Sequence, residues 1–206
     1  MKVLIVDTET TGLPISYAIN AFDKPNNWPH LVSLSWALLD TENMKISANY
    51  SSYVIPDGWT IPPEVTAIHG ISEEMARADG NSLNHVIDMF MSVPCDIIVS
   101  HNSNFDKNVI INAIVHDLGI PYDNEEDVIR EPFLCSMKAS TDICKIETRR
   151  GYKWPKLSEL YYHVMKKHIP VETEHQALFD TLNLAEIIRN SHDLRVALGI
   201  DNKDEN

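Results

Sequence analysis

The N-terminal stretch MKVLIVDTETTG places two carboxylates directly after a short apolar segment, and a glycine follows them. The carboxylates belong to Asp7 and Glu9. Side chains two residues apart in a strand project from the same face, about 7 Å apart along the chain. Both groups should therefore point to one place at a strand end, where they repel each other unless a proton or a cation lies between them. The pair indicates either a metal or catalytic site or a solvated strand end.

The pair alone does not decide between these alternatives. A chain with 30 acidic residues among 206 should contain about four acid-x-acid pairs by chance. Other such pairs do occur, at Asp40/Glu42, Asp123/Glu125, Glu125/Asp127 and Glu172/Glu174. What distinguishes the first pair is the apolar strand before it and the Thr-Thr-Gly turn after it.

Length and composition are typical of one globular domain, since 44% of the 206 residues are hydrophobic. We predict a single domain over residues 1–206, with a core over 1–190 and a C-terminal end at 191–206 whose last residues fray. The sequence has no signal-peptide pattern and no run long enough to span a membrane. Three cysteines without a C-x-x-C spacing predict reduced thiols in a cytoplasmic protein, and no disulfide or zinc site.

The formal net charge of −13 disfavours a protein that coats nucleic acid through a broad basic face. It is compatible with a protein that holds a few nucleotides through metal ions and a local basic patch.

The order of the predicted elements is typical of an α/β fold. We expect a mixed five-stranded sheet, its first three strands antiparallel, flanked by helices. The predicted strands are 3–6, 30–40, 45–56, 96–102 and 132–139. The predicted helices are 72–78, 82–93, 104–118, 154–167 and 175–190, with Ser72 and Ser82 as caps of the first two.

Two further acids stand where these elements would position them. Asp106 follows the fourth strand at the start of a helix, where an acid is also favoured by the helix dipole alone. Asp180 lies among apolar residues of the last long helix, where an ionised group is costly unless it is paired, metal-bound or partly exposed. His175 precedes that helix and would lean over the same place, whereas we expect His163 and His168 at the surface.

The stretches VDTETTG, SHNSNFD and HQALFD, in this order and spacing, resemble the DnaQ-like DEDDh family of 3′→5′ exonucleases, which have a ribonuclease H-like fold. IPPEVTAIHGIS resembles the family segment that contacts the terminal nucleotide, with Glu64 and His69 in its polar positions. KLSEL resembles the helix start before the third motif. The resemblance covers residues 1–190, nearly the whole chain.

The resemblance implies a site with two divalent cations, Mg²⁺ or Mn²⁺, which suit oxygen ligands. Asp7, Glu9 and Asp180 would hold one ion, and Asp7 would bridge to a second ion that Asp106 supports. His175 would accept the proton of the attacking water. We further predict substrate contacts from Thr10, Thr11, Glu64, His69 and Asn102.

One departure from the family pattern is the long connection LPISYAINAFDKPNNWPH, residues 13–30. Its aromatic residues Tyr17, Phe22 and Trp28 either stack on a terminal base or pin the loop onto the protein.

A second notable segment is KIETRRGYKWPK, residues 145–156. We predict that it is the main nucleic-acid contact outside the metals, with Arg149 and Arg150 as binding residues, because basic side chains alternate there with Tyr152 and Trp154. The alternative is a solvated basic loop with Trp154 in the core.

The predicted function is therefore a stand-alone 3′→5′ exonuclease that acts at nucleic-acid 3′ ends, on DNA in preference to RNA and on single strands in preference to duplexes. An exoribonuclease for short or structured RNA is one alternative. A non-catalytic module that binds nucleic-acid ends or a polymerase is the other. No membrane partner and no obligatory polymerase is expected.

Overall fold

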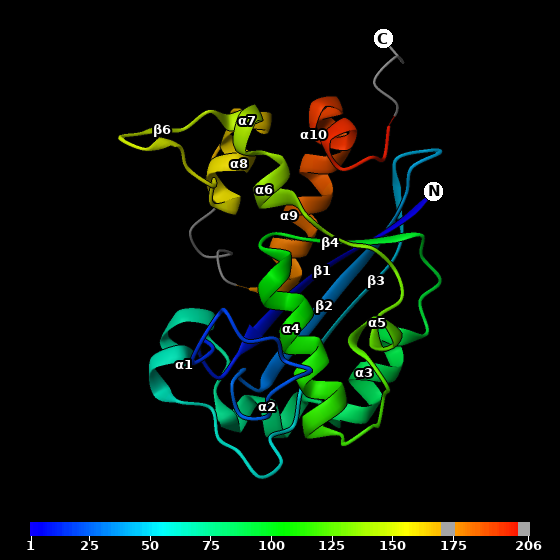
Figure 1. Cartoon of the computed structure of the whole chain (residues 1–206), viewed down its shortest axis with the longest axis vertical. Helices are drawn as coiled ribbons and strands as arrows, with labels where there is room; N and C mark the ends of the chain where they lie inside the picture. Colours follow the sequence, from blue (N-terminus) through cyan, green and yellow to red (C-terminus); the bar gives the residue numbers. More distant parts are fainter. Residues whose placement is uncertain (170–175, 202–206) are drawn as a thin grey trace.

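The centre of the protein is a five-stranded mixed sheet, seen in the computed structural model, which describes residues 1–169 and 176–201. The strand order is β3-β2-β1-β4-β5 (Figure 1). Strands β1, β2 and β3 are antiparallel neighbours, whereas β4 runs parallel to β1 and β5 parallel to β4. The predicted fold is confirmed. The strands are β1 (Lys2–Thr10), β2 (Leu31–Asp40), β3 (Lys45–Tyr53), β4 (Ile97–Ser100) and β5 (Phe133–Cys135).

Helices cover both faces of this sheet. Those before β5 are α1 (Pro63–His69), α2 (Glu73–Asp79), α3 (Leu83–Met91), α4 (Ser103–Asn112) with the π-helical turn η1 (Ala113–Asp117), and α5 (Glu125–Val128). Those after β5 are α6 (Ser136–Ala139), α7 (Thr141–Cys144), α8 (Leu157–Met165), α9 (Ala177–Asn190) and α10 (His192–Ala197). A small hairpin of β6 (Glu147–Thr148) and β7 (Gly151–Tyr152) lies between α7 and α8. Within the described residues, no helix combines the length and the apolar character that a bilayer-spanning segment needs.

Strand β1 separates two hydrophobic cores because its buried side chains alternate between the faces of the sheet. Leu4 and Val6 belong to the core that contains residues of α3 and α4. Val3 and Ile5 belong to the core that contains residues of α8, α9 and α10. The next two odd-numbered residues are the acids, so the alternation sends both carboxylates toward the α9 side.

Several predicted boundaries are wrong. The strand expected over 132–139 is only three residues long, because the chain turns into α6 at Ser136. Ser136 is fully buried, and its hydroxyl donates to the Ser100 carbonyl at the end of β4. The strand expected over 96–102 ends at Ser100, and the helix expected over 104–118 loses its α-helical pattern after Asn112.

The 13–30 connection is fixed to the body of the protein by Trp28, which is only 4% exposed. Its indole Nε1 donates to the Ile19 carbonyl at 2.8 Å, and its ring makes edge contacts with Tyr17 and Phe105. The pinning role proposed for these aromatic residues therefore holds for Trp28. The ring of Tyr17 stays half exposed.

Candidate active site

Asp7 and Glu9 lie within β1, which continues to Thr10, and not beyond its end. They pair across the ladder with Ser35 and Ser33 of β2. Because the cross-strand partners are small, we infer that the space above the two acids is left for other side chains. Both carboxylates lie on the face of the sheet that α9 covers.

Helix α9 supplies the third carboxylate, from Asp180 in its first turn. Asp7, Glu9 and Asp180 each offer one oxygen atom, and these atoms all lie within 4.8 Å of one another. The three residues come from positions 7, 9 and 180, so the fold brings together the two ends of the motif pattern. This is the arrangement that the sequence motifs predict.

Asp106 lies in the first turn of α4 and is only 3% exposed. Its Oδ1 accepts hydrogen bonds from the backbone N–H of Thr8 at 3.1 Å and from the Thr8 hydroxyl at 2.8 Å. Thr8 can reach it because even-numbered residues of β1 face α4. Two donors on one oxygen fix the orientation of this carboxylate.

The acids repel one another strongly. Burial raises the pKa of Asp7 well above its usual range, with further increases from the charges of Asp106, Glu9 and Asp180. Burial, then the charges of Asp180 and Asp106, raise the pKa of Glu9 to about 8. Burial raises the pKa of Asp106 to about 6, against the opposing hydrogen bonds from Thr8. Such a cluster favours either protons or a cation.

The donor set fits a hard divalent cation. Carboxylate oxygens are the ligands that Mg²⁺ and Mn²⁺ prefer, and one or two carboxylates plus phosphate oxygens usually suffice. The three carboxylates converge and their negative charges repel one another, so the cluster is suited to bind a divalent metal ion.

The exonuclease family model matches residues 4–188, most of the chain. The chain belongs to the exonuclease family. It is of the DnaQ-like, DEDDh type with a ribonuclease H-like fold, as the motifs predict. The family uses divalent metal ions, which agrees with the acidic cluster. Nuclease chemistry on nucleic acid is the activity that accompanies this membership.

Solved structures share the fold of this exonuclease. Exonuclease X in complex with 5′ overhanging duplex DNA has 24% sequence identity and a TM-score of 0.62, covering 96% of this chain and 93% of its own. E. coli Exonuclease I in complex with a dA16 oligonucleotide has 18% identity and a TM-score of 0.66, covering 92% of this chain and 40% of its own. The exonuclease thus spans about two fifths of Exonuclease I. No curated protein matches it in sequence.

The predicted general base of the exonuclease, His175, lies outside the described residues. The hydroxyls of Thr10 and Thr11 are used to close the active-site turn. Thr10 Oγ1 donates to the Gly12 carbonyl at 2.7 Å, and Thr11 Oγ1 accepts from the His30 backbone N–H at 3.0 Å. Any contact from these two residues to substrate would have to share these hydroxyls or use the backbone.

The other predicted substrate residues differ in accessibility. Glu64 is exposed in the first turn of α1. His69, at the end of α1, is buried, and its Nδ1 accepts from the Ile71 backbone N–H. Its Nε2 is buried without a hydrogen-bond partner among the described residues. His69 lines a small cavity together with Gln176 and Phe179, two residues that lie close to Asp180 in the sequence.

Asn102 precedes α4 in the left-handed region, at φ 80°. Its carbonyl accepts from the Phe105 backbone N–H, so this unusual conformation turns the chain from β4 directly into the helix that carries Asp106.

Sequence reasoning overlooked His101, which joins the active site to the basic segment. Its Nδ1 lies 3.0 Å from the Ser136 hydroxyl and its Nε2 lies 2.9 Å from the Pro155 carbonyl. Burial lowers the pKa of His101 to about 4 despite the opposing Pro155 carbonyl, so the ring stays neutral near pH 7. The only sequence signal is its position within the SHNSNFD motif.

The basic segment forms an exposed hairpin, with Arg149 and Arg150 at the turn between β6 and β7. Trp154 is 59% exposed, so the alternative that placed it in the core is wrong. The ammonium of Lys138 lies 5.8 Å from the centroid of the Trp154 ring. The segment thus presents an aromatic surface and basic side chains together.

Proposed function

We propose that this protein is a metal-dependent 3′→5′ exonuclease that removes 5′-mononucleotides from DNA, with single strands preferred. The observation that carries the proposal is the convergence of Asp7, Glu9 and Asp180 within 4.8 Å, with a buried Asp106 held behind them. All four acids lie within residues 4–188, the part of the chain that the exonuclease family model matches.

Two divalent ions, Mg²⁺ or Mn²⁺, are the cofactors that fit. Asp7, Glu9 and Asp180 would hold one, and Asp7 with Asp106 would hold the other. When bound, such a pair neutralises charge on the attacking and leaving oxygens of a phosphodiester.

The protein side chains supply positioning and proton transfer. Thr8 keeps the carboxylate of Asp106 in one orientation, so that group does not have to reorganise during the reaction. His175 would take a proton from water as its oxygen attacks phosphorus and the bond from phosphorus to the 3′ oxygen breaks. The leaving 3′ oxygen takes a proton from solvent water and stays on the shortened strand as its new 3′ hydroxyl, and the released nucleotide keeps its 5′ phosphate.

The choice of DNA and the choice of a single strand each rest on one line of support. The solved structures that share this fold include Exonuclease X with a DNA duplex and Exonuclease I with a DNA oligonucleotide. The exposed aromatic and basic side chains of residues 145–156 suit a flexible single strand, whose bases are free to stack. We assign Thr10, Thr11, Glu64, His69, Asn102, Arg149 and Arg150 to substrate binding, and residues 1–206 to one exonuclease domain.

Direct assay of labelled strands tests the proposal. DNA and RNA of the same sequence, single- and double-stranded, carry a label at either the 3′ or the 5′ end. With Mg²⁺, we expect immediate release of a 3′-labelled mononucleotide and a descending ladder from 5′-labelled DNA, fastest for the single strand. Faster turnover of RNA would favour an exoribonuclease. Tight binding without turnover in Mg²⁺ and in Mn²⁺ would identify a non-catalytic binding module.

A further inference from the structure

The charge of the chain is strongly segregated. Residues 138–167, here called the basic lobe, contain eight Lys and Arg and three acids, a formal charge of +5. The rest of the chain contains nine Lys and Arg and 27 acids, a formal charge of −18. Figure 1 shows that the lobe, with α6, α7, the β6 hairpin and α8, gathers at one end of the molecule.

Most cationic side chains of the lobe form no ion pair with another described residue. In the part of the chain that the structure describes, Lys153 pairs with Glu159 and Lys167 pairs with Glu186, and no other Lys or Arg of the lobe forms an ion pair. Unpaired cations clustered on one side of an acidic protein attract polyanions to that side.

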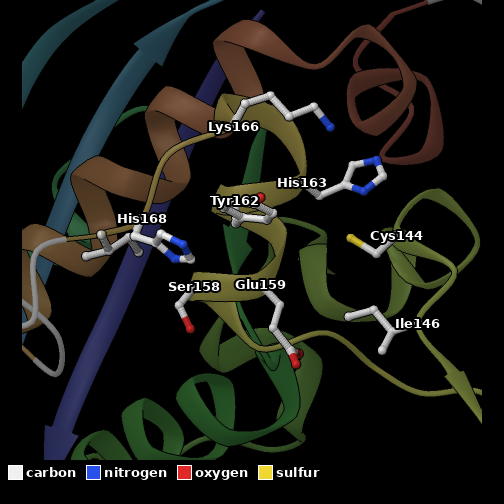
Figure 2. Close-up of a pocket in the computed structure, with 9 residues that line it drawn as sticks. Cys144, Ile146, Ser158, Glu159, Tyr162, His163, Lys166 and His168 are labelled. Atoms are coloured by element: carbon white, nitrogen blue, oxygen red, sulfur yellow. The ribbon is translucent and has the colours of Figure 1, made fainter.

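The lobe carries a groove of about 390 Å³ along α8. Its floor and walls include Cys144, Ser158, Tyr162, His163, Lys166 and His168 (Figure 2). The volume lies in the range of sites that enclose a small organic ligand such as one nucleotide.

The chemistry of this groove combines a stacking surface with cationic and hydrogen-bonding groups. The carboxylate of Glu159 also lines it and is paired with Lys153. The Tyr162 ring is 48% exposed and stacks on His168, with ring centroids 4.6 Å apart and planes inclined by 21°. His163 follows Tyr162 directly in α8, and Lys166, the residue that caps the helix end, lies one turn beyond Tyr162 and donates its backbone N–H to the Tyr162 carbonyl at 2.9 Å. An aromatic face accepts any base, and an ammonium group neutralises a phosphate.

The groove is structurally connected to the catalytic acids. The carbonyl of Pro155, two residues before α8, accepts from Nε2 of His101, the residue after β4, and Asn102 and Asp106 follow His101 in the chain. The exposed Trp154 and the hairpin lie at the same junction. This junction is the route by which a strand held at the acids would reach the hairpin and the outer face of α8.

We propose that the α8 groove binds one nucleotide of the substrate strand, several positions upstream of the 3′ end, by stacking its base on Tyr162 and pairing its phosphate with Lys166. The inference rests on the proposed function, because the position of the bound nucleotide is counted from the 3′ end at which cleavage is proposed. A strand suits the groove better than a free mononucleotide because the cations continue beyond the groove over the rest of the lobe.

Affinity measured against strand length tests the site. Fluorescent oligothymidylates of 2 to 16 nucleotides are titrated in EDTA, so that no cleavage occurs, with wild type, Tyr162→Ala, Tyr162→Phe and Lys166→Gln. We expect Tyr162→Ala to weaken binding of long strands about tenfold, the effect of one lost stacking contact. Short strands should bind unchanged, and Tyr162→Phe should restore the affinity because the ring remains.

Controls separate the groove from general charge and from folding. Lys45→Gln removes an exposed cation at the start of β3, outside residues 138–167, and should leave affinity and its length dependence unchanged. Circular dichroism melts establish that each variant is folded. A wild-type experiment needs no variant: a strand with one 5-iododeoxyuridine, moved stepwise from the 3′ end, should crosslink to the peptide that contains Tyr162 from an interior position only.

Three outcomes would overturn the inference about the groove, and a fourth would refute only the proposed function. Equal affinities for wild type and Tyr162→Ala at every length would remove the groove from the strand path, as would crosslinks confined to other peptides. A loss that already appears with the dinucleotide and is competed by thymidine 5′-monophosphate would make the groove a mononucleotide site. Absence of hydrolysis in Mg²⁺ and Mn²⁺ with an intact length-dependent effect would refute the proposed function and leave the groove standing.

Discussion

Replacing Glu9 by Gln should stabilise the protein in the absence of divalent ions, although Glu9 is a predicted catalytic residue. The reason is the crowding of carboxylates around it. Burial and the charges of Asp180 and Asp106 raise the pKa of Glu9 from 4.5 to about 8 in the folded protein. The folded state then holds the proton more tightly than the unfolded state, so wild-type stability falls as the pH rises from about 4.5 to about 8.

The size of the effect follows from the shift. A full shift from 4.5 to about 8 costs at most about 5 kcal/mol once Glu9 is ionised in the folded protein, at 1.36 kcal/mol per pKa unit. Because Asp7, Asp106 and Asp180 share the repulsion, and because Glu9 retains some contact with solvent, removing one charge relieves only a part. We expect Glu9→Gln to gain about 1–3 kcal/mol at pH 8 and much less at pH 5. For a chain of this size that is an increase in Tm of about 2–10 °C at pH 8.

Thermal melts in EDTA between pH 5 and pH 8.5 measure this directly. Glu42→Gln, an exposed acid in the turn between β2 and β3, is the matched control and should leave the pH dependence of Tm as in wild type. With millimolar Mg²⁺ or Mn²⁺ the order of the two Tm values should change in favour of wild type. A ligand that binds only the folded state gives the larger stabilisation to the protein that binds it better. A Glu9→Gln protein that melts at or below the wild-type temperature throughout this pH range in EDTA would refute the electrostatic argument.

Three further predictions concern activity and binding. Asp7→Asn, Asp106→Asn and Asp180→Asn should each remove most nuclease activity while the variant stays folded, and near-normal turnover in any of them would exclude that acid from the site. His175→Ala should lower the turnover number by about 10²–10⁴ and abolish one ionisation in the pH profile, whereas His85→Ala, an exposed histidine of α3, should change neither. Arg149→Ala with Arg150→Ala should weaken strand binding and reduce the slope of log K against log salt by about 1.4, at 0.7 per lost phosphate contact, and an unchanged slope would remove the hairpin from the interface.

The sequence predicts those parts of the site that depend on local periodicity. Asp7 and Glu9 are correctly predicted to share one face, because the two-residue repeat of a strand determines which face each side chain takes, although the strand itself extends past them to Thr10. The helix caps follow from local chemistry as well. The hydroxyls of Ser72 and Ser82 accept from the backbone N–H groups of Met75 and His85, as capping serines do.

The sequence does not predict contacts that join distant segments. Thr8 and Asp106 are 98 residues apart, and their hydrogen bonds exist only because β4 lies beside β1 and delivers α4 to the opposite face of the sheet. His101 and Pro155, 54 residues apart, are joined for a similar reason. Local patterns also mislead where burial competes with propensity. The apolar run that ends near Ser136 predicts a longer strand, but the strand stops there, where the buried Ser136 hydroxyl donates to the Ser100 carbonyl.

The separation of charge between the basic lobe and the rest of the chain has a consequence for the kinetics of encounter. A formal +5 at one end and −18 elsewhere make the molecule a strong electric dipole, so an approaching polyanion exerts a torque that turns the lobe toward it before contact. Approaches from the acidic sides are repelled, which reduces the number of unproductive collisions. The association rate with a strand should therefore fall steeply with ionic strength, because added salt screens the orienting field over distances beyond about 10 Å.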